Sequence, residues 1–409
     1  MSKIDQLLAE LCPDGVEYRQ VKDVFDRLKG TPITAAKMKE IGSPDGDVRV
    51  FAGGKTRILA HESDIPNANI TRVPAVLVQS RGVIDFVYCD HPFTFKNEMW
   101  AYTEANAVSV KFLYYVLRAN AEHFRKLAAG KGSMPQISLG ATDRFEIPVP
   151  PIPVQEEVVR ILDSFTELEA ELEAELEVRR AQYAYYRDQL LSFDSVNIKR
   201  ERVVSWLSLG DLGSLFGGLT GKTKRDFGVG GSRYVTYVNV YNNASVDVAL
   251  LDNVSVGPSE RQNAVRKGDV LFTASSENPE DAGMSSVVLE DLGDGVYLNS
   301  FCFGWRPNAG AELLPGYLKY VFRSAKVRAQ IERTANGVTR YNVSKEKFKR
   351  VKIPVPSLET QRRVVEFLDR FDELTTSLTE GLPAEIEARR QQYEHYRDRL
   401  LDFPRKEAC

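Results

Sequence analysis

Apolar residues along the middle of the chain recur at alternating spacings of three and four, which predicts a long amphipathic helix. This seam comprises Val158, Ile161, Phe165, Leu168, Leu172 and Leu176, followed by Tyr183, Tyr186, Leu190 and Phe193. Such spacing places one narrow apolar stripe along a helix, as in a coiled coil. Because a lone helix would expose that stripe to water, we expect it to pack against a second helix of the chain.

An internal repeat supplies that second helix. The segment 147–150 (IPVP) recurs at 353–356, and Gln155 recurs as Gln361 at the same offset of 206. Further on, the block RRAQYAYYRDQLLSF matches RRQQYEHYRDRLLDF at ten of fifteen positions. Because Gly381 and Pro383 interrupt the second copy, we expect it to kink or to split into two helices.

Each helical repeat follows a diverged domain that contains short apolar strands. Strand-like stretches include VRVFA, AVLVQS and GVIDFVY in the first half and YVTYVNV, DVLFTA, SSVVLE and SFCFGW in the second. Their alternation and β-branched content are typical of strands, and a helix is expected at 111–127. The predicted fold class is therefore α+β, with two pseudo-symmetric domains and two long helices. The predicted segments are domain 1–146, helical repeat 147–199, domain 200–352 and helical repeat 353–409.

Composition narrows the classes of function. The 409 residues have a net charge of −3 and include four cysteines and four histidines, with no CxxC pair. A zinc site and a disulfide scaffold are therefore not expected, and no metal ligand is assigned. The N-terminal segment MSKIDQLLAELCPDG is charged in every turn. It predicts neither a secretory nor a membrane segment, so we expect a cytoplasmic protein with no membrane partner.

The charge is distributed unevenly among the four segments. The two domains have net charges of +1 and +5, whereas the two helical repeats have −6 and −3. A duplicated domain with a rigid spacer suits a ligand with two sites at a fixed separation, and the grooves of duplex DNA repeat about every 34–36 Å. Since phosphate neutralisation needs a local patch of Lys and Arg rather than a high overall pI, double-stranded DNA is the expected partner.

Basic and amide residues gather in turns of both domains. Arg pairs with guanine and Gln or Asn with adenine in base recognition, whereas Lys mainly contacts phosphates. Each loop could equally be an ordinary solvated surface, but as groups we interpret them as DNA contacts. The candidates are Lys55, Arg57, Gln79, Arg81, Lys131, Ser133 and Gln136 in the first domain, and Thr220, Lys222, Lys224, Arg225, Arg340, Tyr341, Asn342 and Lys345 in the second.

Motifs for catalysis are incomplete. The segment 217–223 (GGLTGKT) resembles a phosphate-binding loop, but Phe216 stands where that motif needs its first glycine. The segment 278–280 (NPE) lacks the second proline and the aromatic residue of amino-methyltransferase motifs, and no G-x-G-x-x-G follows a strand. Four unclustered histidines offer no partner for a nucleophile. We therefore predict no catalytic residue and no enzyme activity for this chain.

The IPVP lead-ins, Gln155 and Gln361, and the two matching helical blocks resemble the specificity subunits of type I restriction-modification systems. The resemblance covers the whole chain. It implies that 1–146 and 200–352 are target recognition domains, each contacting one half of a split DNA sequence. It also implies that the helical repeats form an antiparallel coiled coil that fixes the gap between the two halves.

The resemblance further implies protein partners. Two methyltransferase subunits would dock on the helical repeats, and motor-nuclease subunits would join the complex. S-adenosylmethionine, ATP and Mg²⁺ would bind to those partners, with no cofactor in this chain. The residues implied for docking or for the helical repeat are Gln155, Phe165, Tyr183, Tyr186, Gln361, Phe371, Tyr393 and Tyr396. Glu156 follows the first glutamine and Arg362 the second, so equal docking by both repeats is left open.

Two other functions are left open by the sequence. One is an enzyme with its own nuclease or DNA methyltransferase site, which methyl transfer by the isolated chain would reveal. The other is a structural coiled-coil adaptor without DNA binding. Failure to bind duplex DNA in the presence of the methyltransferase partner would favour the adaptor.

Overall fold

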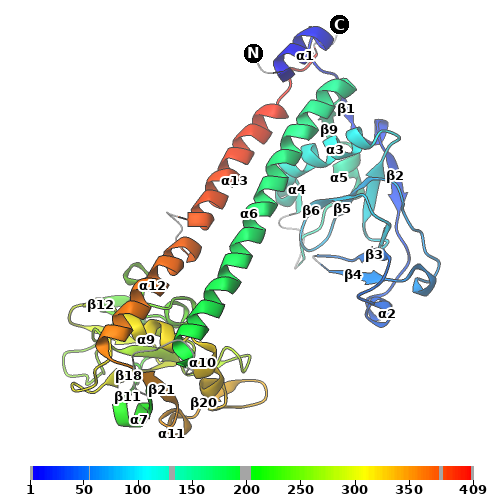
Figure 1. Cartoon of the computed structure of the whole chain (residues 1–409). Helices are drawn as coiled ribbons and strands as arrows, with labels where there is room; N and C mark the ends of the chain where they lie inside the picture. The colour runs from blue at the N-terminus through cyan, green and yellow to red at the C-terminus, as the bar shows by residue number, and fades with distance from the viewer. Residues whose placement is uncertain (1–2, 55, 129–133, 194–203, 377–380, 407–409) are drawn as a thin grey trace. The chain divides into compact units, whose positions relative to one another are not determined.

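The chain folds into two units, each combining an α+β domain with parts of the long helices (Figure 1). Unit 1 comprises Met1–Glu173 and Ile386–Cys409, and unit 2 comprises Ala174–Glu385. The computed structural model describes residues 3–54, 56–128, 134–193, 204–376 and 381–406. Each unit is described by itself below.

Unit 1 contains an antiparallel four-stranded sheet and a smaller mixed sheet. The large sheet has the order β2-β8-β5-β6, and the small sheet has the order β4-β3-β7 with β3 and β7 parallel. A third, two-stranded sheet pairs β1 with β9. The strands are β1 (Tyr18–Gln20), β2 (Asp26–Lys29), β3 (Val48–Phe51), β4 (Arg57–Ala60), β5 (Ala75–Gln79), β6 (Asp85–Cys89), β7 (Phe93–Phe95), β8 (Trp100–Thr103) and β9 (Glu146–Pro148).

The main core of unit 1 lies between its large sheet and its helices. Val76, Leu113 and Leu162 are fully buried in this cluster, which also includes Phe403 near the C-terminus. Burying one such side chain contributes roughly 1.5–3 kcal/mol, so the core attaches the start of α6 to the domain. The helices of the domain are α1 (Lys3–Leu11), α2 (Ala35–Ile41), α3 (Ala107–Ala119), α4 (Ala121–Ala128) and α5 (Leu139–Asp143).

The two ends of the described chain pair with each other inside unit 1. The Val16 N–H donates to the Pro404 carbonyl (2.8 Å), and the Lys406 N–H donates to the Val16 carbonyl (2.9 Å). Gly15, with φ of +92°, lies so close to Pro404 that a Cβ would come within 2.8 Å of its oxygen. Only glycine fits this conformation and this contact. Unit 1 is therefore assembled from two segments far apart in sequence.

Unit 2 has its own large antiparallel sheet in the order β11-β18-β14-β16 and a mixed sheet in the order β13-β12-β17. A further sheet has the order β15-β20-β19, and β10 pairs with β21. The strands are β10 (Ser205–Ser208), β11 (Gly213–Gly217), β12 (Phe227–Val235), β13 (Leu251–Val254), β14 (Val270–Thr273), β15 (Ser275–Ser276), β16 (Ser285–Val287), β17 (Val296–Leu298), β18 (Cys302–Pro307), β19 (Ala335–Asn336), β20 (Tyr341–Val343) and β21 (Lys352–Val355). The helices of the domain are α7 (Leu209–Leu212), α8 (Tyr237–Asn242), α9 (Pro315–Val321), α10 (Ala325–Glu332) and α11 (Lys345–Phe348).

The two domains share one topology. Strands β2, β8, β5 and β6 correspond in order and direction to β11, β18, β14 and β16, and β4-β3-β7 corresponds to β13-β12-β17, including the parallel pair. Registers agree as well: Val76 pairs with Tyr102 in unit 1, and Val270 pairs with Trp305 in unit 2. The internal repeat predicted for the helices therefore extends through the domains.

The spacer helices are antiparallel, as expected. Helix α6 (Ile152–Ser192) runs unbroken for 41 residues, or about 60 Å at 1.5 Å per residue. In unit 1 its first half lies beside α13 (Gly381–Leu400) (Figure 1). There Phe165 contacts Tyr396, and Glu169 pairs with Arg390. In unit 2 its second half contacts α12 (Leu358–Thr376) in the same antiparallel sense.

Three local details sharpen or correct the sequence predictions. The second repeat is described as two helices, α12 (Leu358–Thr376) and α13 (Gly381–Leu400), and Gly381 has a φ of +78°, outside the helical region. The helix expected at 111–127 is two helices that break at Asn120. The strand expected at 234–240 ends at Val235 and α8 follows, because the Thr236 hydroxyl caps it by accepting from the Asn239 N–H (3.2 Å).

Among the described residues, no helix is long and apolar enough to cross a membrane.

Candidate nucleic-acid interface

Three loops of unit 1 that carry sequence-predicted candidates meet through backbone hydrogen bonds. The Gly54 N–H donates to the Arg81 carbonyl (3.0 Å), and the Gly82 N–H donates to the Pro135 carbonyl (2.9 Å). The Ile137 N–H donates to the Ser80 carbonyl (3.0 Å). These contacts join the turn after β3, the turn after β5 and the segment before α5 into one surface.

Three side chains of this surface form what we call the cross-strand triad of unit 1: Arg81, Met134 and Gln136. Arg81 and Gln136 are opposed in an antiparallel bridge, so their side chains project from the same face. Arg81 Nε lies 3.2 Å from Met134 Sδ, across the diagonal of the same pair. All three side chains are exposed.

A cavity of about 490 Å³ opens beside this triad. Apolar side chains form much of its wall, and charged groups stand among them. Its lining includes Met38, Ile58, Arg81, Lys96, Glu98 and Met134. The cavity therefore places charged groups and apolar walls next to the exposed Arg81.

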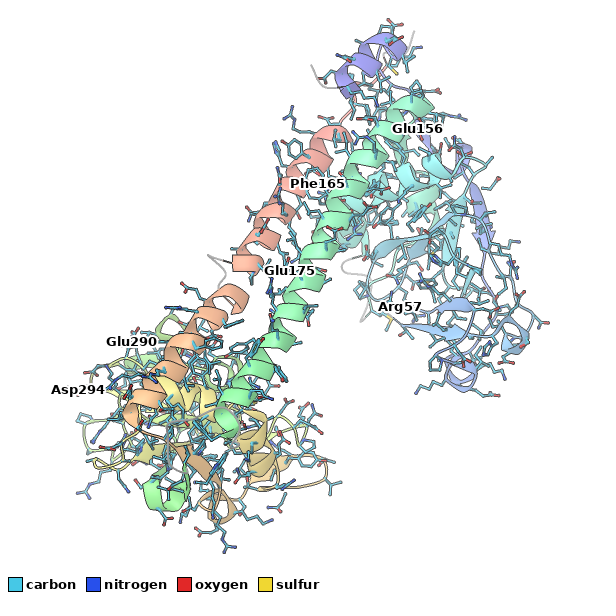
Figure 2. The ribbon with its side chains drawn as sticks, in the orientation of Figure 1. Arg57, Glu156, Phe165, Glu175, Glu290 and Asp294 are labelled. Atoms are coloured by element: carbon cyan, nitrogen blue, oxygen red, sulfur yellow. The ribbon has the colours of Figure 1, made fainter. Side chains whose placement is uncertain are left out.

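The other candidates of unit 1 are placed as follows. Arg57 is exposed at the start of β4 (Figure 2). Gln79 is buried at the end of β5, with 7% of its surface exposed, so it underlies the interface instead of lining it. Lys55, Lys131 and Ser133 lie outside the described residues.

Unit 2 contains a topologically equivalent triad: Ser275, Arg340 and Asn342. The Val343 N–H donates to the Ala274 carbonyl (2.9 Å), as Ile137 does to Ser80 in unit 1. Ser275 is opposed to Asn342 in the antiparallel pair of β15 and β20, which places Ser275 at the position of Arg81 and Asn342 at that of Gln136. Arg340 Nε lies 3.3 Å from Ser275 Oγ, across the same diagonal.

The two triads exchange the position of their arginine. In unit 1 the arginine is Arg81, in the turn after β5, and it faces Met134. In unit 2 the residue equivalent to Arg81 is Ser275, on β15, and the arginine, Arg340, is on the segment that faces it. The residue directly opposite the first position is an amide in both units, Gln136 or Asn342. Each unit therefore presents one guanidinium and one carboxamide on the same small face.

Phe301 is a residue of this surface that sequence analysis missed. It lies between β17 and β18 and is 56% exposed, and the Arg340 guanidinium lies 5.7 Å from its ring centre. An exposed aromatic ring beside an arginine is suited to stack on a base or contact a thymine methyl group. Its sequence context, SFCFGW, predicts a buried strand, so the pattern gave no indication that this ring points outward.

The basic loop 220–225 is held in a defined shape. The Thr220 N–H donates to Gln262 Oε1 (3.1 Å), and Thr223 caps a short 3-10 helix at Lys224–Asp226. The hydrogen bonds from Thr223 lower the pKa of Asp226, which keeps this cap ionised. Lys224 and Arg225 are exposed on the short helix.

Lys222 differs from its neighbours in this loop. Its side chain is only 5% exposed and forms an ion pair with Glu260, whose pKa is lowered chiefly by the hydrogen bond from Lys222. An ammonium held in this way is not presented to a phosphate. The loop begins beside the turn that carries Phe301, because the Leu219 N–H donates to the Leu298 carbonyl (2.8 Å).

Two more candidates flank Arg340. Tyr341 is half-buried on β20, and Lys345 is exposed at the start of α11, where the Ser344 hydroxyl caps the helix. Both therefore lie within a few residues of the unit 2 triad.

The two glutamines assigned to the helical repeats are buried in their own units. Gln361 donates to the carbonyls of Glu312 (2.8 Å) and Pro356 (2.9 Å) and accepts from the Leu314 N–H (2.9 Å). Gln155 donates only to the Pro150 carbonyl (2.7 Å), and its Oε1 is buried without a partner among the described residues. Both side chains brace the proline-rich lead-ins and are not displayed to a partner.

The aromatic residues assigned to docking lie along the seam between helices. In unit 1 Phe165 stacks on Tyr396 with 5.6 Å between ring centres and also contacts Tyr393 (Figure 2). In unit 2 Tyr186 contacts Phe367 and Phe371. Tyr183 is half-buried, and burial raises its pKa. Tyr396 and Tyr186 are partly exposed, at 39% and 38%, so part of the seam remains available to a partner.

A matching tyrosine–aspartate contact fixes each domain to its spacer helix. The Tyr115 hydroxyl on α3 donates to Asp163 on α6, and the Tyr320 hydroxyl on α9 donates to Asp369 on α12. Lys319 adds an ion pair to Asp372 in unit 2, and Lys111 adds one to Asp163 in unit 1. Each domain is therefore held by charge-assisted bonds as well as by its core.

Groups suited to covalent chemistry are sparse. Burial raises the pKa of the Cys89 and Cys302 thiols to about 12, so neither is a thiolate at neutral pH. Within the described ranges, no three His, Cys, Asp or Glu side chains are gathered as a metal site.

Comparison with known proteins matches both halves of the chain to one family. The model of the "Type I restriction modification DNA specificity domain" matches residues 13–178 and 205–388. The chain is 32% identical over 381 residues to the EcoR124I/EcoR124II specificity subunit of Escherichia coli, covering 88% of each chain. It is 30% identical to a putative type I specificity subunit of Haemophilus influenzae, covering 75% of this chain and 77% of the other.

Solved structures agree on the fold. A type I S subunit from M. genitalium aligns with a TM-score of 0.51 and 17% identity, over 95% of this chain and 96% of that one. A chain from a study of complex assembly in the type I R-M system aligns with a TM-score of 0.59 and 15% identity, over 95% and 97%. This chain therefore belongs to the specificity-subunit family of type I restriction-modification systems.

Proposed function

We propose that this chain recognises double-stranded DNA as the specificity subunit of a type I restriction-modification complex, with each unit contacting one half of a bipartite target. The main observation in support is the duplication of an exposed face. The same strand order presents one arginine and one carboxamide in both units. Arg57, Lys224, Arg225 and Lys345, all exposed, are the proposed phosphate contacts around these faces.

The spacer helices are proposed to fix the number of unrecognised base pairs between the two half-sites. An unbroken helix resists bending far better than a loop does, and α6 runs through both units without interruption. The tyrosine–aspartate contacts at each domain support this role, because a ruler needs its ends fixed to the parts that it spaces.

Catalysis is proposed to reside in partner subunits. Two methyltransferase subunits with S-adenosylmethionine, and motor-nuclease subunits with ATP and Mg²⁺, are the proposed partners of this non-catalytic chain. The incomplete catalytic motifs of the sequence support this assignment. The partly exposed aromatic seam at Tyr186 and Tyr396 supports docking of a protein on the spacer helices.

The decisive experiment compares methylated positions in the host genome with and without this gene by single-molecule sequencing. We expect one split motif to lose its methylation when the gene is deleted and to regain it on complementation. An unchanged set of methylated motifs would contradict the proposal. In parallel, the isolated chain incubated with S-adenosylmethionine and host DNA is expected to transfer no methyl group; transfer would favour an enzyme instead.

A further inference from the structure

We infer that the two cross-strand triads are the base-recognising elements of the two half-sites, and that each triad selects a guanine and an adenine in neighbouring base pairs. The inference rests on the proposed function and goes further, because it names the bases and the side chains that select them. It is argued from the equivalence of the triads and from the chemistry of their side chains.

The first step is that the triad positions are equivalent in space within each domain. The same backbone hydrogen bond, from Ile137 to Ser80 and from Val343 to Ala274, sets the register in both units. The diagonal contact between the first two triad positions recurs at 3.2 Å and 3.3 Å. Divergent sequences have therefore kept one local geometry while the side chains changed.

The second step is that the functional groups persist although the residues do not. The arginine of unit 1 is Arg81, after β5, whereas the arginine of unit 2 is Arg340, on the segment that faces Ser275. Each triad therefore retains one guanidinium. A carboxamide occupies the third position in both. Packing alone does not require this pairing, because Arg81, Gln136, Arg340 and Asn342 are exposed.

The third step matches these groups to bases. A guanidinium donates two hydrogen bonds to guanine O6 and N7, and a carboxamide both donates to and accepts from adenine N6 and N7. Opposed residues in an antiparallel pair have Cβ atoms about 4.5–5.5 Å apart, and successive base pairs are about 3.4 Å apart. Arg81 and Gln136 can therefore reach adjacent or next-adjacent base pairs, and Arg340 and Asn342 can do the same.

The test is selection from a randomised duplex library by the full chain in complex with its methyltransferase partner, followed by sequencing. The wild-type complex is expected to select two base clusters with a constant gap, each containing a guanine and an adenine in adjacent or next-adjacent base pairs. Arg81→Ala should relax selection at one guanine of one cluster by about 5- to 100-fold. Gln136→Ala should relax a neighbouring adenine of that cluster, and Arg340→Ala and Asn342→Ala should affect only the other cluster.

Arg57→Ala is the matched control, since this exposed arginine lies outside the triad. It should weaken binding evenly across the selected sequences. The double variant with Arg81→Ser and Met134→Arg copies the arrangement of unit 2 into unit 1, and it should recover the guanine that Arg81→Ser alone loses. Circular dichroism establishes that each variant is folded.

The outcomes separate the two levels of the argument. A wild-type complex that selects no split motif overturns the proposed function and the inference together. A split motif that Arg81→Ala weakens evenly, or relaxes at a base other than guanine, overturns the inference and leaves the proposed function standing.

Discussion

The two units share one topology, but equivalent residue positions are stabilised by different interactions in each unit. In unit 2 Arg306 forms a bidentate ion pair with Asp269, with both distances 2.7 Å, and Asp269 is 1% exposed. The equivalent residue of unit 1 is Thr103, whose hydroxyl donates to the Pro74 carbonyl (2.7 Å). The two units therefore have the same strand positions, but at this position unit 2 is stabilised by an ion pair and unit 1 by a neutral hydrogen bond.

The proline-rich lead-ins show the same divergence. Gln361 makes three hydrogen bonds and caps the first turn of α9 through Leu314. In unit 1 helix α3 has its own N-cap, because the Asn106 side chain accepts from the Val108 N–H (2.9 Å). Gln155 makes one hydrogen bond, and its Oε1 has no partner among the described residues. The same residue type at the repeated position therefore makes three hydrogen bonds in unit 2 and one in unit 1, so we expect it to contribute more to the stability of unit 2.

The largest expected difference between the units concerns Arg306. Arg306→Met leaves the buried Asp269 carboxylate without its partner and should lower the free energy of unfolding of unit 2 by about 3–5 kcal/mol. Thr103→Val at the equivalent position should cost unit 1 about 1 kcal/mol. Hydrogen exchange followed by mass spectrometry, peptide by peptide, measures both. Equal losses would show that the ion pair adds nothing beyond the neutral bond.

The second comparison tests the two glutamines. Gln361→Ala removes the partner of three backbone groups, one of them in a buried contact and two in partly buried contacts. It should destabilise unit 2 by about 2–4 kcal/mol, whereas Gln155→Ala should cost unit 1 about 1 kcal/mol. Faster amide exchange in α9 is the expected local effect in the first variant. If Gln155→Ala proves the more damaging substitution, the assignment of Asn106 as the substitute cap is wrong.

A pH dependence that arises from one buried carboxylate is expected in unit 1. Hydrogen bonds from Arg160 and Lys3 lower the pKa of Glu157 from 4.5 to about 2, and this contact ties α1 to α6. Because the pKa in the folded chain is depressed, the stabilisation is present above pH 4.5 and is lost as the pH falls toward 2. Both cations are largely exposed, so solvent screening limits the contribution to about 1 kcal/mol.

Glu157→Gln provides the measurement. Its stability deficit against the wild type, followed by thermal unfolding, should be present at pH 7 and should shrink as the pH falls below 4.5. Unit 2 has Arg363 at the corresponding position, so exchange in unit 2 should not change with this substitution. A stability deficit that is the same at pH 2.5 as at pH 7 would show that the deficit does not arise from the ionised Glu157 carboxylate.

The smallest expected effect separates two lysines of one loop. Lys224 is exposed whereas Lys222 is paired with Glu260. Lys224→Ala should reduce the salt dependence of DNA binding by about one unit of slope, as expected for one lost phosphate contact. Lys222→Ala should leave that slope unchanged. Titrations of a selected duplex at several salt concentrations distinguish the two variants. A reduced slope for Lys222→Ala would show that Lys222 also contacts a phosphate.

Sequence alone predicted the parts of this fold that depend on local pattern. The seam through Phe165 and Tyr186 gave the long helix, and Gly381 marked the place where the second repeat splits. Basic turns around Arg81 and Arg340 were identified because glycine and charge cluster there.

The remaining features depend on contacts between distant residues. The equivalence of Arg81 with Ser275 follows from strand register, which no local pattern encodes. The inward position of Lys222 depends on Glu260, and the outward position of Phe301 depends on a turn inside an apolar run. Sequence pattern found the loops, but only tertiary pairing distinguishes which side chains they present.

The pairing of Val16 with Pro404 and Lys406 has a consequence for the order of events during translation. Unit 2 is contiguous in the chain, so it can fold as soon as its residues have left the ribosome. Unit 1 must wait for α13 and the C-terminal segment, a delay of roughly 10–50 s at synthesis rates of about 5–20 residues per second. During that interval the seam residues of α6 that contact α13, such as Phe165, lack their partners on α13. The nascent chain therefore remains exposed to chaperones, proteases and aggregation until α13 has been synthesised.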